Sequence, residues 1–269
     1  MTIERSPETF PSAQLFAHDF DGTVANTFEP APTGVGVEEA YNQAIETVFD
    51  TAALEEYLQS GGLQNRAPSE VVRQLAPDAT DSELSALTDN LIAAKLSVLL
   101  DQIGSPLPGG GVWPRPIEGF PEFLAQLEDI RKKGAPIDVL ALSSGHDAFI
   151  RRVYEVWSEP QPDHIIATEQ IAELAPQLSL RPDQLIKPQA GLMDAARYIW
   201  RSAYNVREPM FDERSRVVYA GDDTAKDGGL AINGGVDFVL IGKENPSANW
   251  RTVAHHLSLG RAAYAGVML

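Results

Sequence analysis

The chain of 269 residues contains no cysteine. Disulfide bridges, thiolate nucleophiles and cysteine-based zinc sites are therefore excluded, so a metal ion would have to be held mainly by oxygen ligands. Positive charge is also scarce, since 21 Lys and Arg stand against 38 Asp and Glu and give a formal net charge of -17. A surface of that sign repels polyanions, so neither nucleic acid nor an anionic membrane is expected as a partner.

Long apolar runs are missing as well. No stretch approaches the roughly 18 consecutive apolar residues that a membrane-spanning helix needs. The first residues, MTIERSPETFPSA, carry acids and prolines where a signal peptide has a basic start and an apolar centre. We therefore expect a cytoplasmic protein, and its 43% hydrophobic residues are enough to form a full core.

Several shorter apolar runs, AQLFAHD, DVLALSS, RVVYAGDD and VDFVLIG, end in small or acidic residues. Continuous hydrophobicity is typical of strands that are buried on both faces, as in a parallel sheet covered by helices. Helical patterns such as PEFLAQLEDIRKKG separate these runs. The alternation predicts an α/β fold with a Rossmann-like open parallel sheet.

Residues 27–114 interrupt this alternation with helical periodicity, and Thr80 with Glu83 forms a capping-box pattern before one of the apolar stripes. A structureless loop of this length is not expected in a compact protein. We therefore predict an all-helical domain at 27–114, inserted into an α/β core made of residues 1–26 and 115–269.

Polar residues follow three of the predicted strands, where parallel α/β sheets bind their ligands. They are Asp19 and Asp21 after the first run, Ser143 and Ser144 after DVLAL, and Asp222 and Asp223 after RVVYAG. Each group alone has an ordinary alternative: a hairpin turn for Asp-Gly, a helix N-cap for serine, and a solvated turn for Gly-Asp-Asp. Together, carboxylates at adjacent strand ends are tolerable if a divalent cation such as Mg²⁺ lies among them.

The ordered set of motifs resembles the haloacid dehalogenase-like (HAD) hydrolase superfamily. The matching residues are DFDGT at 19–23, the serine after DVLAL, Lys187 with Pro188, and Gly221-Asp222-Asp223 with Asp227. The resemblance covers about residues 13–26 and 115–245. The helical insertion is similar to the cap of phosphoglycolate phosphatase-like members.

The resemblance implies that Asp19 is the nucleophile that attacks phosphorus, and that Asp21 is the general acid and base. Mg²⁺ would be bound by the Asp19 side chain, the Asp21 main-chain carbonyl and Asp222. Ser143 and Lys187 would hold the phosphoryl oxygens.

Two assignments stay open within the motifs. The serine doublet allows either Ser143 or Ser144 to supply the hydroxyl, and we favour Ser143 with the backbone N–H of Ser144 assisting. Asp223 and Asp227 are both candidates to contact the metal ligands without binding the metal themselves, and Asp223 also competes with Asp222 for the ligand position. His18 and His146 are interpreted as packed or surface residues.

The expected activity is Mg²⁺-dependent hydrolysis of a small phosphorylated metabolite through an aspartyl-phosphate. In the inserted domain, Arg66 is a candidate for contact with a second anionic group of the substrate. A sugar phosphomutase of the same fold is one alternative, and a non-catalytic binding protein is another. The sequence does not define the oligomeric state.

Overall fold

The computed structural model describes residues 13–62, 68–203 and 216–257, which form two compact units. The described residues of the first unit come from the ranges Met1–Asn26, Pro116–Ile150 and Glu159–Leu269. Those of the second come from Thr27–Arg115 and Arg151–Ser158.

The second unit therefore differs from the expected inserted domain, 27–114, by Arg115 and by Arg151–Ser158. The added segment is the C-terminal part of helix α6, Asp147–Trp157. Within this unit the Trp157 indole N–H donates to the carbonyl of Pro114 at 2.8 Å. Sequence periodicity identifies such a helix but not the unit against which it packs.

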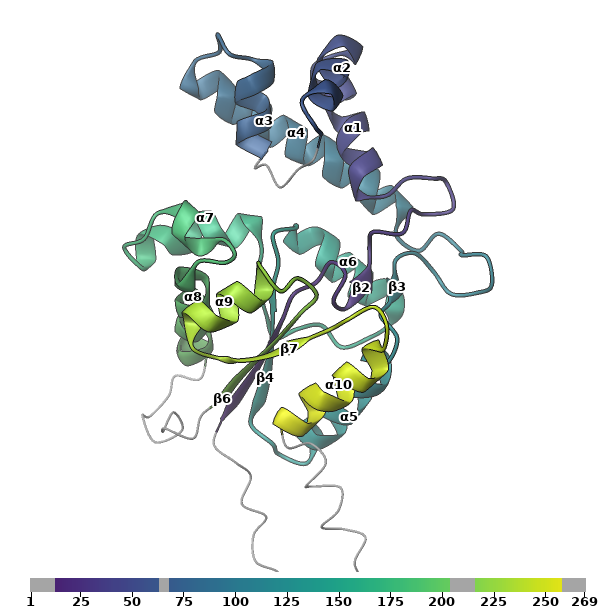
Figure 1. Ribbon diagram of the computed structural model, residues 1–269, viewed down its shortest axis with the longest axis vertical. Helices are drawn as coiled ribbons and strands as arrows, with labels where there is room; N and C mark the ends of the chain where they lie inside the picture. The colour runs from purple at the N-terminus through teal and green to yellow at the C-terminus, as the bar shows by residue number, and fades with distance from the viewer. Residues whose placement is uncertain (1–12, 63–67, 204–215, 258–269) are drawn as a thin grey trace, which may run out of the picture. The chain divides into compact units, whose positions relative to one another are not determined.

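The first unit is built on a five-stranded sheet in the order β5-β4-β1-β6-β7, in which every pairing is parallel (Figure 1). The predicted α/β class is therefore confirmed. The short strand β5 was not predicted. The strands are β1 Gln14–His18, β4 Ile137–Leu142, β5 His164–Ile166, β6 Arg216–Gly221 and β7 Asp237–Leu240.

Helices cover both faces of this sheet, with α5 and α10 on one face and α8 and α9 on the other (Figure 1). Two short strands, β2 Ala25–Asn26 and β3 Arg115–Pro116, pair separately. The remaining elements of the first unit are α5 Phe120–Lys132, α7 Thr168–Gln177, a 3₁₀ turn at Pro182–Leu185, α8 Ala190–Ala203, α9 Asp227–Gly234 and α10 Pro246–His256.

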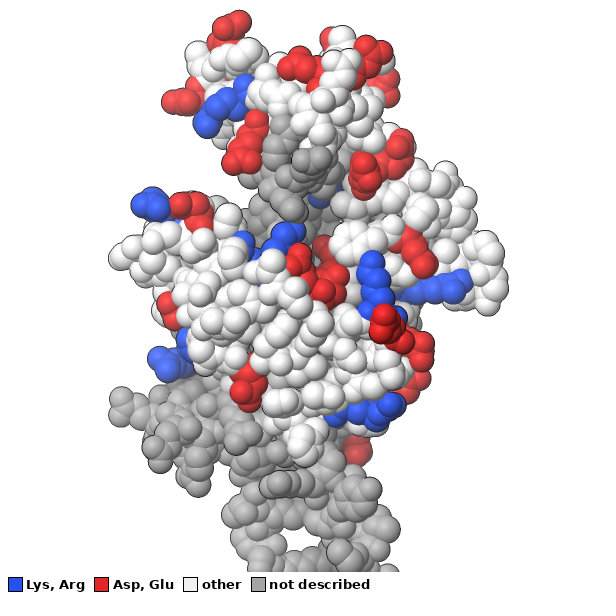
Figure 2. All heavy atoms as spheres, in the orientation of Figure 1, with Lys and Arg blue, Asp and Glu red and all other residues white. Residues whose placement is uncertain are grey.

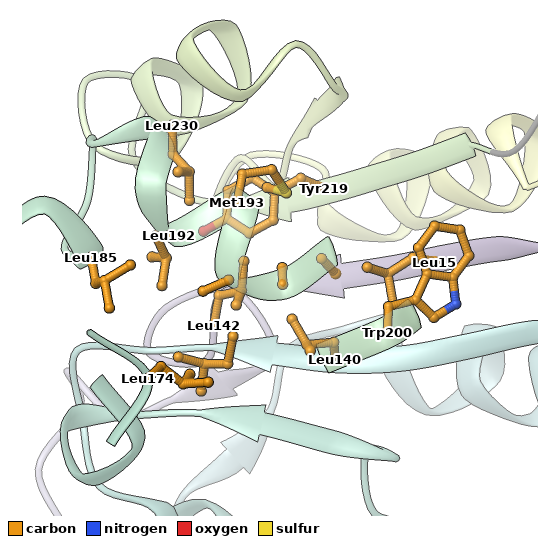
Figure 3. Close-up of a cluster of buried hydrophobic side chains, with 14 of the residues drawn as sticks. Leu15, Leu140, Leu142, Leu174, Leu185, Leu192, Met193, Trp200, Tyr219 and Leu230 are labelled. Carbon is orange, nitrogen blue, oxygen red and sulfur yellow. The ribbon is translucent and has the colours of Figure 1, made fainter. Parts of the chain in front are cut away.

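Strand alternation separates two kinds of core. Leu15 and Ala17 of β1 belong to a largely aliphatic cluster with α8 and α9 (Figure 3). Phe16 and His18, which point to the other face, lie among aromatic rings that include Phe120. Both faces of β1 are therefore buried, as the continuous apolar run predicts.

The strand order places the carboxyl ends of β1 and β6 at a topological switch point. The chain leaves β1 towards β4 on one side, whereas it leaves β6 towards β7 on the other. Connections that diverge in this way open a crevice at the strand ends, and ligands of α/β proteins bind there.

The second unit is helical, with α1 Val37–Val48, α2 Thr51–Gln59, α3 Pro68–Leu75 and α4 Asp81–Gln102. Its core includes Ile45, Val72 and Leu91. Thr80 and Glu83 form the predicted capping box at the start of α4. Across the described parts of both units, no helix combines the length and the apolar character needed to cross a membrane.

A glycine pair tests the contact between α5 and α10. Gly119 has φ 86°, and a Cβ there would lie 2.7 Å from the Ser247 Cα of α10, whereas Gly110 has φ 96° with open space around it. We expect Gly119→Ala to destabilise the protein by about 1–3 kcal/mol more than Gly110→Ala, because only the first change adds overpacking to backbone strain. Urea denaturation measures both, and equal losses would contradict the close packing.

Candidate active site

Asp19 lies directly after β1 at the switch point. Its backbone N–H donates to the carbonyl of Ala220 at 2.8 Å, so the residue continues the pairing between β1 and β6. The residue is only 8% exposed. Burial raises the pKa of its carboxyl from the ordinary value to about 7, although the charge of Lys187 opposes the change. A turn with Gly22 at φ 77° then reverses the chain.

Lys187 brings two buried carboxylates together. Its ammonium group forms ion pairs with Oδ1 of Asp19 and, at 2.8 Å, with Oδ1 of Asp227, and its side chain is 10% exposed. Burial alone would lower the pKa of Lys187, but the charges of Asp19 and Asp227 outweigh it and raise the pKa. The lysine therefore remains charged in the interior.

Asp223 and Asp227, which follow β6, have different hydrogen-bond partners and therefore different roles. Asp227, at the start of α9, is buried and accepts a hydrogen bond from the backbone N–H of Asp223 at 3.1 Å. The Asp223 carboxylate instead accepts from the backbone N–H groups of Ala225 and Lys226, which shapes the turn and lowers its pKa. Asp227 therefore faces Lys187, while Asp223 stabilises the turn that leads to it.

Gly221 makes the close approach of Asp227 possible. A Cβ at this glycine would lie 2.3 Å from the Cβ of Asp227 and 2.5 Å from its Oδ2. Any side chain at position 221 would therefore displace the carboxylate. The glycine was quoted in the sequence motif, but its role follows only from the packing.

Three carboxylates offer ligand atoms for a cation. Oxygens of Asp19, Asp222 and Asp227 all lie within 4.8 Å of one another. The Thr23 hydroxyl lies 3.4 Å from Oδ2 of Asp19 and 3.4 Å from Oδ1 of Asp222. Burial, with the nearby charge of Asp227, raises the pKa of Asp222.

This donor set fits a hard divalent cation. The Thr23 hydroxyl has one proton, so it cannot satisfy Asp19 and Asp222 at the same time. An all-oxygen set containing ionised carboxylates is the coordination that Mg²⁺ prefers. Both oxygens of Asp227 are engaged, Oδ1 by Lys187 and the Tyr219 hydroxyl and Oδ2 by the backbone N–H of Asp223. Lys187 contacts Asp19 through Oδ1 only, so Oδ2 of Asp19 and the carboxylate of Asp222 are the better candidates for direct ligation.

Ser143 is the serine of the doublet that points into the site. It is 4% exposed, whereas Ser144 is exposed. The Ser143 hydroxyl accepts from the backbone N–H of Gly145 at 2.9 Å, and a Cβ on Gly145 would lie 3.1 Å from this hydroxyl and 3.4 Å from Oδ2 of Asp21. The hydroxyl and the Asp21 carboxylate therefore both border the space next to the Cα of Gly145, close enough to act on one ligand.

The first turn of α7 holds the serine loop. The Thr168 hydroxyl donates to the carbonyl of Ser144 at 3.1 Å, and its backbone N–H donates to the carbonyl of Gly145. Glu169 contacts the His146 ring at 2.8 Å and accepts from the backbone N–H of Asp147. Sequence reasoning did not find this support, since the partners are more than 20 residues apart.

The two remaining sequence questions concern His18 and Arg66. His18 is fully buried, and its Nδ1–H donates to the carbonyl of Asp19 at 2.8 Å. Burial lowers its pKa to about 4, so the ring is neutral and structural at neutral pH. Arg66 lies outside the described residues.

No protein-family model matches the sequence, and no curated protein matches it. Similar solved structures include CbbY from Rhodobacter sphaeroides in complex with phosphate, at 18% identity over 84% of each chain with a TM-score of 0.49. A predicted phosphoglycolate phosphatase from Haemophilus somnus shares 13% identity, covering 85% of this chain and 84% of its own, with a TM-score of 0.48.

A third is the putative HAD-hydrolase YfnB from Bacillus subtilis bound to magnesium, at 12% identity over 86% of this chain and 88% of its own, with a TM-score of 0.40. Many of the similar structures are HAD-superfamily hydrolases.

Removing the buried lysine should make stability strongly dependent on pH. Lys187→Met leaves Asp19 and Asp227 without their cation, which costs about 3–5 kcal/mol when both are ionised. Because loss of the ammonium charge raises the folded pKa of Asp19 further above its unfolded value, the folded state binds an extra proton, and its stability falls as pH rises from about 4 through about 7 and beyond. Denaturation at several pH values with a chelator present measures this loss.

The matched control is Lys133→Met, which removes an exposed lysine paired with Asp129. It should change stability by less than about 1 kcal/mol at every pH. A loss for Lys187→Met that did not vary with pH would contradict the dependence of the two carboxylates on this lysine.

Proposed function

We propose that this protein is a Mg²⁺-dependent phosphomonoester hydrolase of the HAD superfamily that acts on a small phosphorylated metabolite. One observation carries the proposal: the buried Asp19 lies between the Lys187 ammonium on one oxygen and Thr23 with Asp222 on the other. A carboxylate held this way has a fixed orientation and lies close to a positive charge. A nucleophile that forms an aspartyl-phosphate needs both the orientation and the nearby charge.

In the first step, an Asp19 oxygen attacks phosphorus and the bond from phosphorus to the leaving oxygen breaks. Asp21, protonated, gives its proton to that oxygen, so the product leaves as an alcohol. In the second step, Asp21 takes a proton from water as the water oxygen attacks phosphorus. The bond to Asp19 breaks, inorganic phosphate leaves and both aspartates return to their initial states.

The surrounding residues serve charge and position, which is most of what phosphoryl transfer requires. The Ser143 hydroxyl accepts from Gly145, so its own proton remains for a phosphoryl oxygen. Lys187 has three ammonium protons, of which two are directed at Asp19 and Asp227. The third remains for a phosphoryl oxygen.

Asp19 and Asp222, with the main-chain carbonyl of Asp21, would hold Mg²⁺. When bound, the cation would supply positive charge that lowers the pKa of Asp19 and neutralises the phosphoryl oxygens. Acidic side chains are prominent on the face shown in Figure 2. A negatively charged substrate therefore approaches an acidic protein, which makes that local positive charge more important.

The decisive experiment is release of inorganic phosphate from a panel of small phosphomonoesters that includes sugar phosphates and phosphoglycolate. We expect release that requires Mg²⁺ and that falls more than about 1000-fold in Asp19→Asn, because the variant lacks the nucleophile. Asp194→Asn, an exposed surface change, is the matched control and should retain activity. Acid quenching during turnover should trap phosphate on the wild-type chain and not on Asp19→Asn.

Other outcomes would contradict the proposal. Isomerised sugar phosphate without phosphate release would identify a phosphomutase. Stoichiometric metal or phosphate binding by folded protein without turnover of any compound would identify a binding protein.

A further inference from the structure

Tyr219 is a buried tyrosine in a core that otherwise needs only an apolar ring. It lies in β6, is fully buried, and packs beside Met193 in the cluster beneath α8 and α9 (Figure 3). A buried hydroxyl without a partner would cost about 1–3 kcal/mol. Here the hydroxyl donates to Oδ1 of Asp227 at 2.7 Å.

The same carboxylate oxygen is shared with the site lysine. Oδ1 of Asp227 accepts from the Tyr219 hydroxyl and lies 2.8 Å from the ammonium of Lys187. That ammonium also lies 5.7 Å from the centre of the Tyr219 ring and is paired with Asp19. A continuous chain of contacts therefore runs from the tyrosine to the candidate nucleophile.

The tyrosine remains a hydrogen-bond donor at neutral pH. Burial raises its pKa well above the ordinary value, and the negative charges of Asp19 and Asp227 raise it further. The hydroxyl therefore stays protonated, and it fixes one oxygen of Asp227 while Gly221 allows the carboxylate to lie against β6.

We propose that Tyr219 is a positioning residue that acts through Asp227 to hold Lys187 in its place beside Asp19. The proposal rests on the function proposed above. Without the hydroxyl, Oδ1 of Asp227 loses one of its two fixed neighbours, and the ammonium can move towards Asp19. Because a displacement of about 1 Å at a reacting centre can cost up to about 100-fold in rate, a smaller shift is expected to have a measurable effect.

The test is Tyr219→Phe, which removes the hydroxyl and keeps the ring against Met193 and Lys187. We expect kcat to fall about 10-fold with KM changed less than about twofold, because the chemical step depends on position more than substrate binding does. Tyr57→Phe, which changes a buried tyrosine of the helical unit, is the matched control and should leave kcat unchanged. All assays are run well below the thermal midpoint of each variant.

A double-mutant cycle with Asp227→Asn identifies the route of the effect. If Tyr219 acts through Asp227, Tyr219→Phe should lower kcat by less than about twofold in the Asp227→Asn background. Additive losses would overturn the proposal. A lower thermal midpoint with unchanged kcat would also overturn it, because it would show a purely structural role.

A second readout separates this proposal from the proposed function. Mg²⁺ titration of the same four proteins without substrate measures whether Tyr219 and Asp227 are coupled at the carboxylate cluster. If the wild type hydrolyses no phosphomonoester, the proposed function fails, and the titration still tests whether Tyr219 acts on the carboxylate cluster through Asp227. The coupling is supported if Tyr219→Phe weakens Mg²⁺ binding in the wild-type background but has no effect on it in the Asp227→Asn background. Equal Mg²⁺ affinities in all four proteins would overturn the proposal.

Discussion

One buried lysine between two buried carboxylates is the interaction on which the rest of the site depends. The ion pairs of Lys187 offset the desolvation cost of burying Asp19 and Asp227, since isolated charges at such positions would be strongly unfavourable. Uncharged residues serve the same arrangement. Gly221 leaves space for Asp227, and the Tyr219 hydroxyl holds its oxygen. The charged residues of the site therefore stabilise one another, and the neutral residues Gly221 and Tyr219 keep the Asp227 carboxylate in place.

The parallel sheet brings these residues together from distant parts of the sequence. Strands β1, β4 and β6 are adjacent and end at the same edge, so Asp19, Ser143 and Asp222 follow from the topology once the strand order is set. Lys187 reaches the same edge from the segment after the 3₁₀ turn. Because β1 lies in the centre of the sheet and is buried on both faces, the residue that follows it is held by the most constrained part of the fold.

Periodicity and strand-end chemistry predicted the sheet class and the polar groups at 19–21, 143–144 and 222–223, whereas Lys187 and Asp227 were identified through the resemblance to HAD hydrolases. The strand at His164–Ile166 was missed because three residues are too few for a periodic pattern. Spacing could not distinguish Asp222 from Asp223, since the two are adjacent and identical, and the backbone of the turn decides which faces the cluster. Tyr219 was counted as an apolar strand residue, because its contact with Asp227 exists only after folding.

The main-chain hydrogen bond from Asp19 to Ala220 gives the site a defined place in the stability of the molecule. Amide protons in central strands exchange with solvent mainly when the whole domain unfolds, whereas those of exposed turns exchange through frequent local openings. The Asp19 amide belongs to the first group, and the turn at Thr224 and Ala225 to the second. Asp19, which is proposed to carry the phosphoryl group, therefore does not unfold locally. On heating, it should lose its native position only when the sheet unfolds cooperatively.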